Sequence, residues 1–281
     1  MNKACLLYRT KDQPGLVSAI STFLLENNVN VETLEQHSED GVFFTRISWI
    51  DNDQWESKED FKKGFQPIID KFEGEEVVHF FKKTQKLGLF VSREPHALLE
   101  ILNKIETGEF GKIEVPFIIS GLPDAEKIAK RYDIPFYHTP TKKGSLAHET
   151  PQLEIIKKHK PDFIGLARYM KILSEDFINN TGCPIINIHH SFLPSFIGSR
   201  PYEMAYERGV KLIGATSHYV TPVLDDGPII EQGVIRIRSG YSVDYIKKVG
   251  RGIEKETFAK ALTKVLEHKV ILHKNRTVVF E

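Results

Sequence analysis

Short apolar segments separated by longer stretches dominate the chain after residue 86. Each segment has the length and composition of a β-strand, and the earlier intervening stretches have the apolar spacing of helices. Parallel neighbouring strands need such long crossover connections, so the alternation predicts a mostly parallel, doubly wound, Rossmann-like α/β sheet. The five strands expected in this region are Leu87–Val91, Val115–Ser120, Pro135–His138, Phe163–Ala167 and Ile185–Ile188.

The C-terminal part of the chain is richer in strands. Two strands are expected at Ile213–Val220 and Ile229–Ile237, followed by a helix from Ser242 to His268 and a last strand near Thr277–Phe280. We assign residues 87–281 to one domain.

Residues 1–81 follow a different order. Apolar runs and helical spacing predict strand, helix, two strands separated by a polar turn, a second helix and a last strand. This β-α-β-β-α-β order is the ferredoxin-like arrangement. The expected strands are Ala4–Tyr8, Val29–Gln36, Val42–Ile50 and Val77–Phe81. The short charged segment 82–86 contains no apolar residue and is predicted to be a linker.

The charge balance and the apolar runs exclude several classes of partner. Lys and Arg together number 38, as do Asp and Glu, so the chain lacks the positive charge of a general nucleic-acid binder. No apolar run approaches the roughly 18–20 residues that span a bilayer. The two cysteines, Cys5 and Cys183, are too far apart in sequence to indicate a disulfide framework or a zinc site. We therefore expect a cytoplasmic protein with neither nucleic acid nor membrane as a partner.

Two polar side chains at the end of one predicted strand suggest a reactive site. Asn187 and His189 are two positions apart, so they face the same side of the strand, at an edge where open α/β sheets bind ligands. Asp225 lies in a later loop between two strands. An amide and an imidazolium can stabilise an oxyanion, while a carboxylate can orient the imidazole or accept a proton. The three residue types therefore suit acyl transfer.

Simpler interpretations of these residues remain open at this point. The Asn-x-His pair could be a structural hydrogen-bonding pair, and Asp225-Asp226-Gly227-Pro228 could be only a turn. His190 and His218 could form a metal site with His189 and Asp225, but their spacing matches no familiar set of metal ligands. No metal is therefore expected.

Three motifs together resemble the folate-dependent formyltransferase family. They are Asn187-Ile188-His189-His190-Ser191-Phe192-Leu193-Pro194, Gly214-Ala215-Thr216-Ser217-His218-Tyr219-Val220 and Leu224-Asp225-Asp226-Gly227-Pro228. The resemblance implies that Asn187, His189 and Asp225 are the catalytic residues and that His218 lies near the reacting group. By the same resemblance, Met170 and Leu173, in a segment similar to the family's pterin-pocket border, and Leu224 contact the substrate.

The N-terminal segment Asp12-Gln13-Pro14-Gly15-Leu16-Val17 resembles the ACT domain family. In that family a small effector, often an amino acid, approaches the backbone at a strand-to-helix turn. The resemblance implies effector binding at Asp12, Gly15 and Leu16. Two alternatives stay open: Gly15 serves only the turn, or the domain only pairs. Because ACT-like domains usually pair, we expect an even-numbered homo-oligomer, either a dimer or a tetramer.

Features outside the three motifs select one branch of the formyltransferase family. The segment after the first strand of the second domain, from Val91 to Ala97, lacks the Gly-Ser-Asn turn with which glycinamide ribonucleotide enzymes hold a phosphate. An ACT-like domain before a formyltransferase-like domain is similar to the 10-formyltetrahydrofolate deformylase branch. The resemblance implies hydrolysis of 10-formyltetrahydrofolate to formate and tetrahydrofolate, with the folate as substrate and no cofactor. The alternatives are transfer of the formyl group to an amine and a non-catalytic sensor.

The sequence departs from the family pattern at three places outside the catalytic trio. Gly121-Leu122 follows Ser120, Ala97 follows His96, and Glu203 stands where a histidine is common. These departures leave the roles of the surrounding loops in substrate entry or regulation open.

Overall fold

The computed structural model describes residues 3–140, 144–196, 198 and 200–281. Contacts divide the chain into two compact units. Unit 1 contains Met1–Thr84, Glu267–His273 and Val278–Glu281, and unit 2 contains Gln85–Leu266 and Lys274–Thr277. The sequence analysis assigned all of residues 87–281 to the second domain, whereas the contacts group two C-terminal segments with the first. A strand also begins at Gln85, inside the predicted linker.

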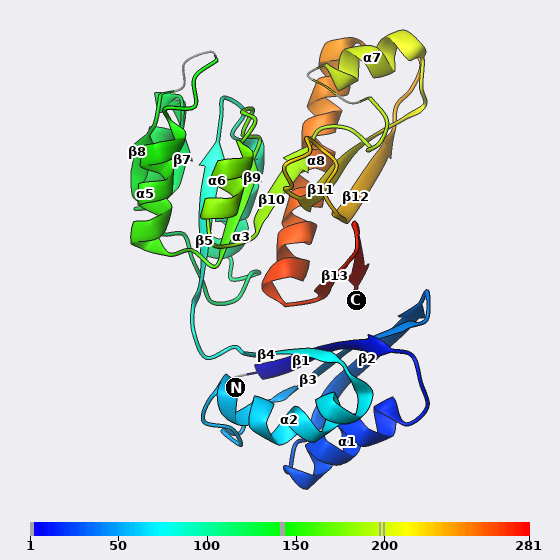
Figure 1. Cartoon of the computed structure of the whole chain (residues 1–281). Coiled ribbons are helices and arrows are strands. Elements are labelled where there is room, and N and C mark those ends of the chain that lie inside the picture. Colours follow the sequence, from blue (N-terminus) through cyan, green and yellow to red (C-terminus); the bar gives the residue numbers. More distant parts are fainter. Residues whose placement is uncertain (1–2, 141–143, 197, 199) are drawn as a thin grey trace. The chain divides into compact units, whose positions relative to one another are not determined.

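Unit 1 contains the predicted ferredoxin-like arrangement. Its antiparallel sheet has the order β2-β3-β1-β4, and α1 and α2 cover one face of it (Figure 1). The elements are β1 (Lys3–Lys11), α1 (Leu16–Glu26), β2 (Val31–Glu39), β3 (Val42–Ile50), α2 (Lys58–Phe72) and β4 (Glu75–Phe80). The apolar faces of the two helices meet alternate residues of the strands, because strand side chains point to opposite faces in turn.

Each face of the unit 1 sheet has its own apolar core. On the helix side, the Trp49 and Trp55 rings pack against Phe61, and Trp49 is fully buried. On the other side, Leu7 and Phe44 pack in a cluster with three residues from the end of the chain, namely Ile271, Val278 and Phe280. Ile271 lies in β13 (Val270–His273), Val278 lies in β14 (Arg276–Val279), and Phe280 follows β14. The two strands form a two-stranded sheet. The sequence analysis expected the second strand and missed the first.

Unit 2 contains the predicted doubly wound sheet, in the order β12-β11-β10-β9-β5-β7-β8. Strands from β10 to β8 along this order are parallel, and β11 and β12 add an antiparallel edge. The elements are β5 (Gln85–Val91), α3 (His96–Glu106), β6 (Ile113–Glu114), β7 (Ile118–Ser120), a 3-10 turn (Pro123–Ala125), α4 (Glu126–Arg131), β8 (Phe136–His138), α5 (Glu149–His159), β9 (Phe163–Ala167), α6 (Glu175–Asn180), β10 (Ile185–His189), α7 (Pro201–Arg208), β11 (Leu212–Tyr219), β12 (Ile229–Arg236) and α8 (Val243–Leu266).

One predicted strand is divided in the structure. The sequence analysis expected a single strand at Val115–Ser120, whereas β6 ends at Glu114 and β7 begins at Ile118. Pro116 lies in the gap. Proline has no N–H to donate to a neighbouring strand, which accounts for the interruption.

The helix α8 packs on β11 and β12 and against α3. Gly250, in its first half, allows a close approach: a β-carbon there would lie 2.3 Å from the Tyr202 hydroxyl oxygen. Tyr202, a residue of α7, is correspondingly buried where α7 packs on α8. Across the described ranges of the chain, neither α8 nor another helix combines the length and the apolar character needed to span a membrane.

Two histidines of unit 1 stack in an unusually close pair. The ring centroids of His79 and His268 are 3.4 Å apart and the rings are nearly parallel. Burial, together with nearby positive charge from Lys58 and Arg46, lowers the pKa of His79 to about 2 and that of His268 to about 4. Both rings are therefore neutral in the folded protein at pH 5–7, whereas in the unfolded chain each has the ordinary pKa of 6.5.

We expect unit 1 to lose stability as the pH falls below 6.5. Between that value and the folded-state pKa values the unfolded chain binds more protons, so protonation favours unfolding by roughly 1 kcal/mol per histidine at pH 5.5. Both tryptophans of the protein, Trp49 and Trp55, lie in unit 1, so tryptophan fluorescence during urea unfolding at pH 7.5 and 5.5 measures this loss. His79→Gln should reduce the loss by about half, whereas the same change at exposed His37 should not. Equal losses in the two variants would contradict the assignment.

Candidate active site

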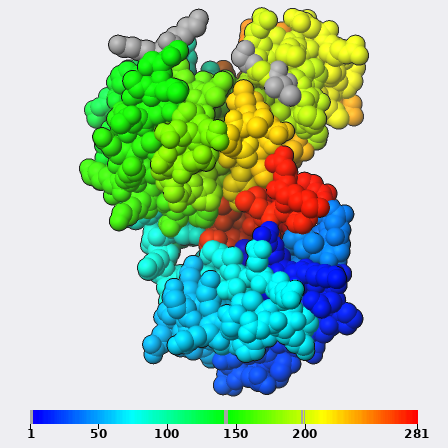
Figure 2. All heavy atoms as spheres, viewed as in Figure 1, coloured from blue at the N-terminus to red at the C-terminus, as the bar shows by residue number. Residues whose placement is uncertain are grey.

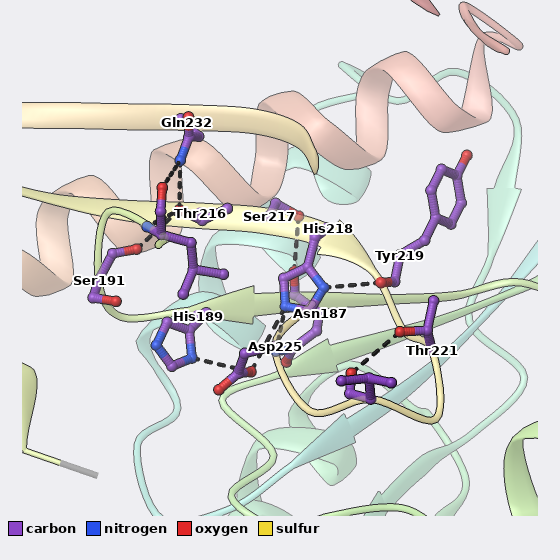
Figure 3. Close-up of polar contacts among 12 residues, drawn as sticks. Asn187, His189, Ser191, Thr216, Ser217, His218, Tyr219, Thr221, Asp225 and Gln232 are labelled. Carbon is purple, nitrogen blue, oxygen red and sulfur yellow. Dashed lines mark hydrogen bonds and ion pairs between the residues drawn. The ribbon is translucent and has the colours of Figure 1, made fainter. Parts of the chain in front are cut away.

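The central strand β10 places the two predicted polar side chains beside a third. It pairs in parallel with β9 and antiparallel with β11, and in this register Asn187 lies opposite His218. Directly opposed residues share a face of the sheet. The Asn187 amide nitrogen lies 3.3 Å from His218 Nε2, as Figure 3 shows.

A loop after β11 brings Asp225 to the same place. The carboxylate Oδ1 lies 3.3 Å from His189 Nδ1 and 3.8 Å from His218 Nε2. Asp225 adopts a left-handed backbone conformation, with φ of 54°, and the chain then passes so close to β11 that a β-carbon at Gly227 would lie 1.7 Å from the Tyr219 carbonyl oxygen. Glycine at 227 is therefore required for the loop that positions Asp225.

The hydrogen bonds of His218 fix its tautomer and orient Asn187. His218 Nδ1 lies 2.8 Å from the Tyr219 carbonyl oxygen, so Nδ1 carries the proton that it donates there. Burial lowers the pKa of His218, against the opposing effects of this bond and of Asp225, and the ring is neutral at pH 7. Its Nε2 is then an acceptor for one N–H of the Asn187 amide. The second N–H of that amide remains for a ligand.

The pair formed by His189 and Asp225 has an ionised carboxylate. Burial alone would raise the pKa of Asp225, but the hydrogen bond and charge of His189, with His218 and His190, hold the pKa below its usual value. The carboxylate accepts from His189 Nδ1, so in the neutral ring Nε2 carries the lone pair. His189 Nε2 is buried and has no hydrogen-bond partner among the described residues. It is therefore the ring atom available to a substrate or a water molecule.

These side chains line a cavity of about 280 Å³ that is largely apolar elsewhere. All seven residues predicted for catalysis and substrate binding contribute to its wall: Met170, Leu173, Asn187, His189, His218, Leu224 and Asp225. In Figure 2 the segment that follows β11, in gold, lies against the light-green segment that follows β9, and both segments supply lining residues. A cavity with few polar groups in an apolar wall is typical of a small-molecule site.

The predicted effector residues lie in the turn between β1 and α1, in unit 1. Gly15 has a φ of 96° and precedes α1, Leu16 is buried, and Asp12 is exposed with its N–H bonded to the Gly41 carbonyl. The turn thus needs its glycine for backbone reasons. These contacts leave effector binding a prediction.

Two of the three departures from the family pattern have clear structural surroundings. Ala97 is fully buried in α3. Glu203 pairs with Lys247 at 2.8 Å, and this hydrogen bond lowers its pKa. Neither residue lines the cavity.

One cluster of charged residues beside the cavity was missed in the sequence. Glu254 of α8 is fully buried and contacts His96, Arg168 and Tyr202. A signal was present: Glu254 lies on the same helix stripe as the buried residues Gly250, Thr257 and Phe258. A charged residue in the apolar stripe of a helix indicates a buried partner. Within the described ranges, no three His, Cys, Asp or Glu side chains form a group that could hold a metal ion.

Comparisons with known proteins assign the chain to a family. Residues 85–262 match the formyl transferase family. Formyltetrahydrofolate deformylases from Synechocystis sp. and Bacillus subtilis are 41% and 42% identical to this chain, over 99% of its length and 98% and 94% of theirs.

Solved structures agree with this assignment. A formyltetrahydrofolate deformylase from Pseudomonas syringae pv. tomato matches 100% of this chain and 95% of its own, with a TM-score of 0.95 and 36% identity. A glycinamide ribonucleotide transformylase from Symbiobacterium toebii matches 72% of this chain and 97% of its own, with a TM-score of 0.66 and 25% identity. With its full-length likeness to deformylases and its match to the formyl transferase domain, the chain belongs to the formyltetrahydrofolate deformylase family.

Proposed function

We propose that the protein hydrolyses 10-formyltetrahydrofolate to formate and tetrahydrofolate. The observation that carries the proposal is the convergence of Asn187, His189 and Asp225 on one wall of a largely apolar cavity. The arrangement supplies an oxyanion donor, a base and a group that orients the base. The names of the full-length relatives support water as the acceptor of the formyl group.

In the proposed reaction His189 acts as the base and Asp225 orients it. A water oxygen forms a bond to the formyl carbon while His189 Nε2 takes one of its protons. The second Asn187 N–H and the imidazolium then stabilise the oxyanion. On collapse the bond between the formyl carbon and the folate nitrogen breaks, and the imidazolium returns its proton to that nitrogen. The formic acid that is released loses its remaining proton to solvent.

Other functional expectations rest on the family and on unit 1. We infer that a small effector such as an amino acid binds at Asp12, Gly15 and Leu16, and that ACT-like units pair to give a dimer or tetramer. The antiparallel sheet of unit 1 and the left-handed Gly15 support this inference. We also propose a cytoplasmic location and a place in one-carbon metabolism connected with purine biosynthesis.

The direct test is incubation of the protein with 10-formyltetrahydrofolate alone. We expect equal amounts of formate and tetrahydrofolate, measured by a coupled formate assay and by the absorbance of the folate. Formate that appears only when an amine is added would instead favour a formyltransferase. No product under either condition would favour a sensor.

Asn187→Ala removes the proposed oxyanion donor. We expect kcat to fall roughly 100- to 1000-fold, with a much smaller change in KM, because the lost hydrogen bond forms mainly in the transition state. The measurement is steady-state formate release. A variant with unchanged kcat would exclude Asn187 from the reaction.

Asp225→Asn removes the negative charge that orients His189 while keeping the shape of the side chain. We expect kcat to fall roughly 1000- to 10,000-fold, with folate binding retained in a fluorescence titration. The matched control is Asp226→Asn, because Asp226 is the exposed neighbour in the same loop and does not line the cavity. If kcat falls equally in the two variants, the activity depends on the conformation of the loop and not on the Asp225 carboxylate.

A further inference from the structure

A network of ionisable side chains lies next to the catalytic trio and takes no part in the mechanism above. Its centre is Glu254, which has no exposed surface. Glu254 Oε2 lies 2.8 Å from His96 Nε2 and 3.2 Å from Arg168 Nε, and Oε1 accepts a hydrogen bond from the Tyr202 hydroxyl. The four side chains come from α8, from the start of α3, from the end of β9 and from α7.

The carboxylate of Glu254 is ionised although it is buried. Burial alone would raise its pKa, but the hydrogen bond from His96 and the charge of Arg168 together hold the pKa below its usual value. Burial and the adjacent carboxylate raise the pKa of Tyr202, which therefore remains a hydrogen-bond donor. An uncompensated buried charge is strongly unfavourable, so Glu254 and Arg168 hold each other in place.

The network occupies the position where a sheet of this topology receives ligands. From β5 the chain builds outward to β7 and β8 on one side and to β9 and β10 on the other, so the winding direction reverses between β5 and β9. Ligands of open α/β sheets bind in the crevice outside the carboxyl ends of the strands at such a reversal. His96 follows β5 and Arg168 follows β9, so their contacts with Glu254 lie at this end of the sheet.

Arg168 also belongs to the wall of the reaction cavity. It lines the same cavity as His189 and Asp225. Its φ is 62°, a left-handed conformation that favours glycine, yet the position holds the largest cationic side chain. Arg168 Nη1 is buried and has no hydrogen-bond partner among the described residues. A backbone outlier that displays a fixed charge beside a reaction centre indicates a functional constraint.

We propose that Arg168, held by Glu254, prevents amines from accepting the formyl group and so leaves water as the nucleophile. This inference rests on the proposed hydrolysis. An amine must approach the formyl carbon with its substituents, and the Arg168 side chain in the cavity wall reduces the space that could hold them. The protonated form of the amine would also be repelled by the positive charge of the Arg168 guanidinium. In a cavity of low polarity this repulsion between like charges is strong. Water is small and neutral, and it is not excluded.

The likeness to a glycinamide ribonucleotide transformylase shows that the fold of unit 2 does not itself select the acceptor. The three catalytic side chains do not select it either, because their roles are the same with either nucleophile. In amine transfer the amine nitrogen bonds to the formyl carbon, the bond to the folate nitrogen breaks, and the proton lost by the amine passes to that nitrogen. Selection must come from groups beside the trio, and Arg168 is the charged group fixed there by a buried partner.

The experiment measures how the formyl group is divided between water and an added amine. The full-length protein is incubated with 10-formyltetrahydrofolate and glycinamide, a small primary amine, and both formate and N-formylglycinamide are quantified. The wild type should give formate with only a small, measurable trace of N-formylglycinamide at high amine concentration. Arg168→Gly, which suits the left-handed backbone, should raise the ratio of formylated amine to formate at least about tenfold, the scale of discrimination that one well-shaped contact provides.

Three further variants separate this role from a structural one. Glu254→Gln keeps the size of the side chain and removes the charge that holds Arg168, so it should shift the ratio in the same direction. Arg168→Lys retains a cation at the position and should shift the ratio less than Arg168→Gly. Lys171→Ala removes another cation of the cavity wall, one that does not contact Glu254, and should leave the ratio at the wild-type value.

The outcomes are distinct from those of the hydrolysis test. If the wild type releases no formate without an amine, the proposed function fails before Arg168 is considered. If the wild type releases formate and the folded Arg168→Gly and Glu254→Gln proteins keep its product ratio, the proposal is overturned. Loss of both products in these folded variants would also overturn it, because the proposal gives Arg168 no part in hydrolysis itself.

Discussion

The antiparallel pairing of β10 with β11 is the constraint on which the candidate active site depends. It sets Asn187 opposite His218 and starts the return loop that carries Asp225 back to His189. Because the pairing is antiparallel, β11 ends beside the start of β10, where the Val220 N–H donates to the Ile185 carbonyl oxygen, and the loop that follows carries Asp225 to His189. Asn187 and His218 are thus held by strand register, whereas Asp225 is carried by one short loop. Backbone contact with β11 at Gly227 restricts that loop in turn.

Much of this arrangement could be predicted from local sequence. The alternation along β10 places Asn187 and His189 on one side, and it depends only on the geometry of a strand. The doubly wound sheet and the ferredoxin-like unit also follow from the order of the apolar segments. The grouping of Asp225 with Asn187 and His189 was predicted from the resemblance of three motifs to the formyltransferase family. The spacing of these residues along the sequence does not determine how the loop that carries Asp225 folds.

The features that were not predicted depend on contacts between residues far apart in sequence, on a single proline or on a very short strand. The network around Glu254 joins residues from four elements, and only the charge on an apolar helix stripe marked it. The single proline that divides β6 from β7 was outweighed by the apolar residues around it. The strand β13 was missed because a four-residue segment with only three apolar residues, Val270–His273, resembles the end of the preceding helix.

The C-terminal hairpin has a consequence for the order in which the protein is made. Leu7 and Phe44 leave the ribosome more than 200 residues before their packing partners Ile271, Val278 and Phe280. During synthesis, this face of the sheet in unit 1 remains uncovered while the whole of unit 2 emerges and folds. Domains generally fold in the order of their synthesis, but the first unit here can complete its second core only after residues 271–280 have been made.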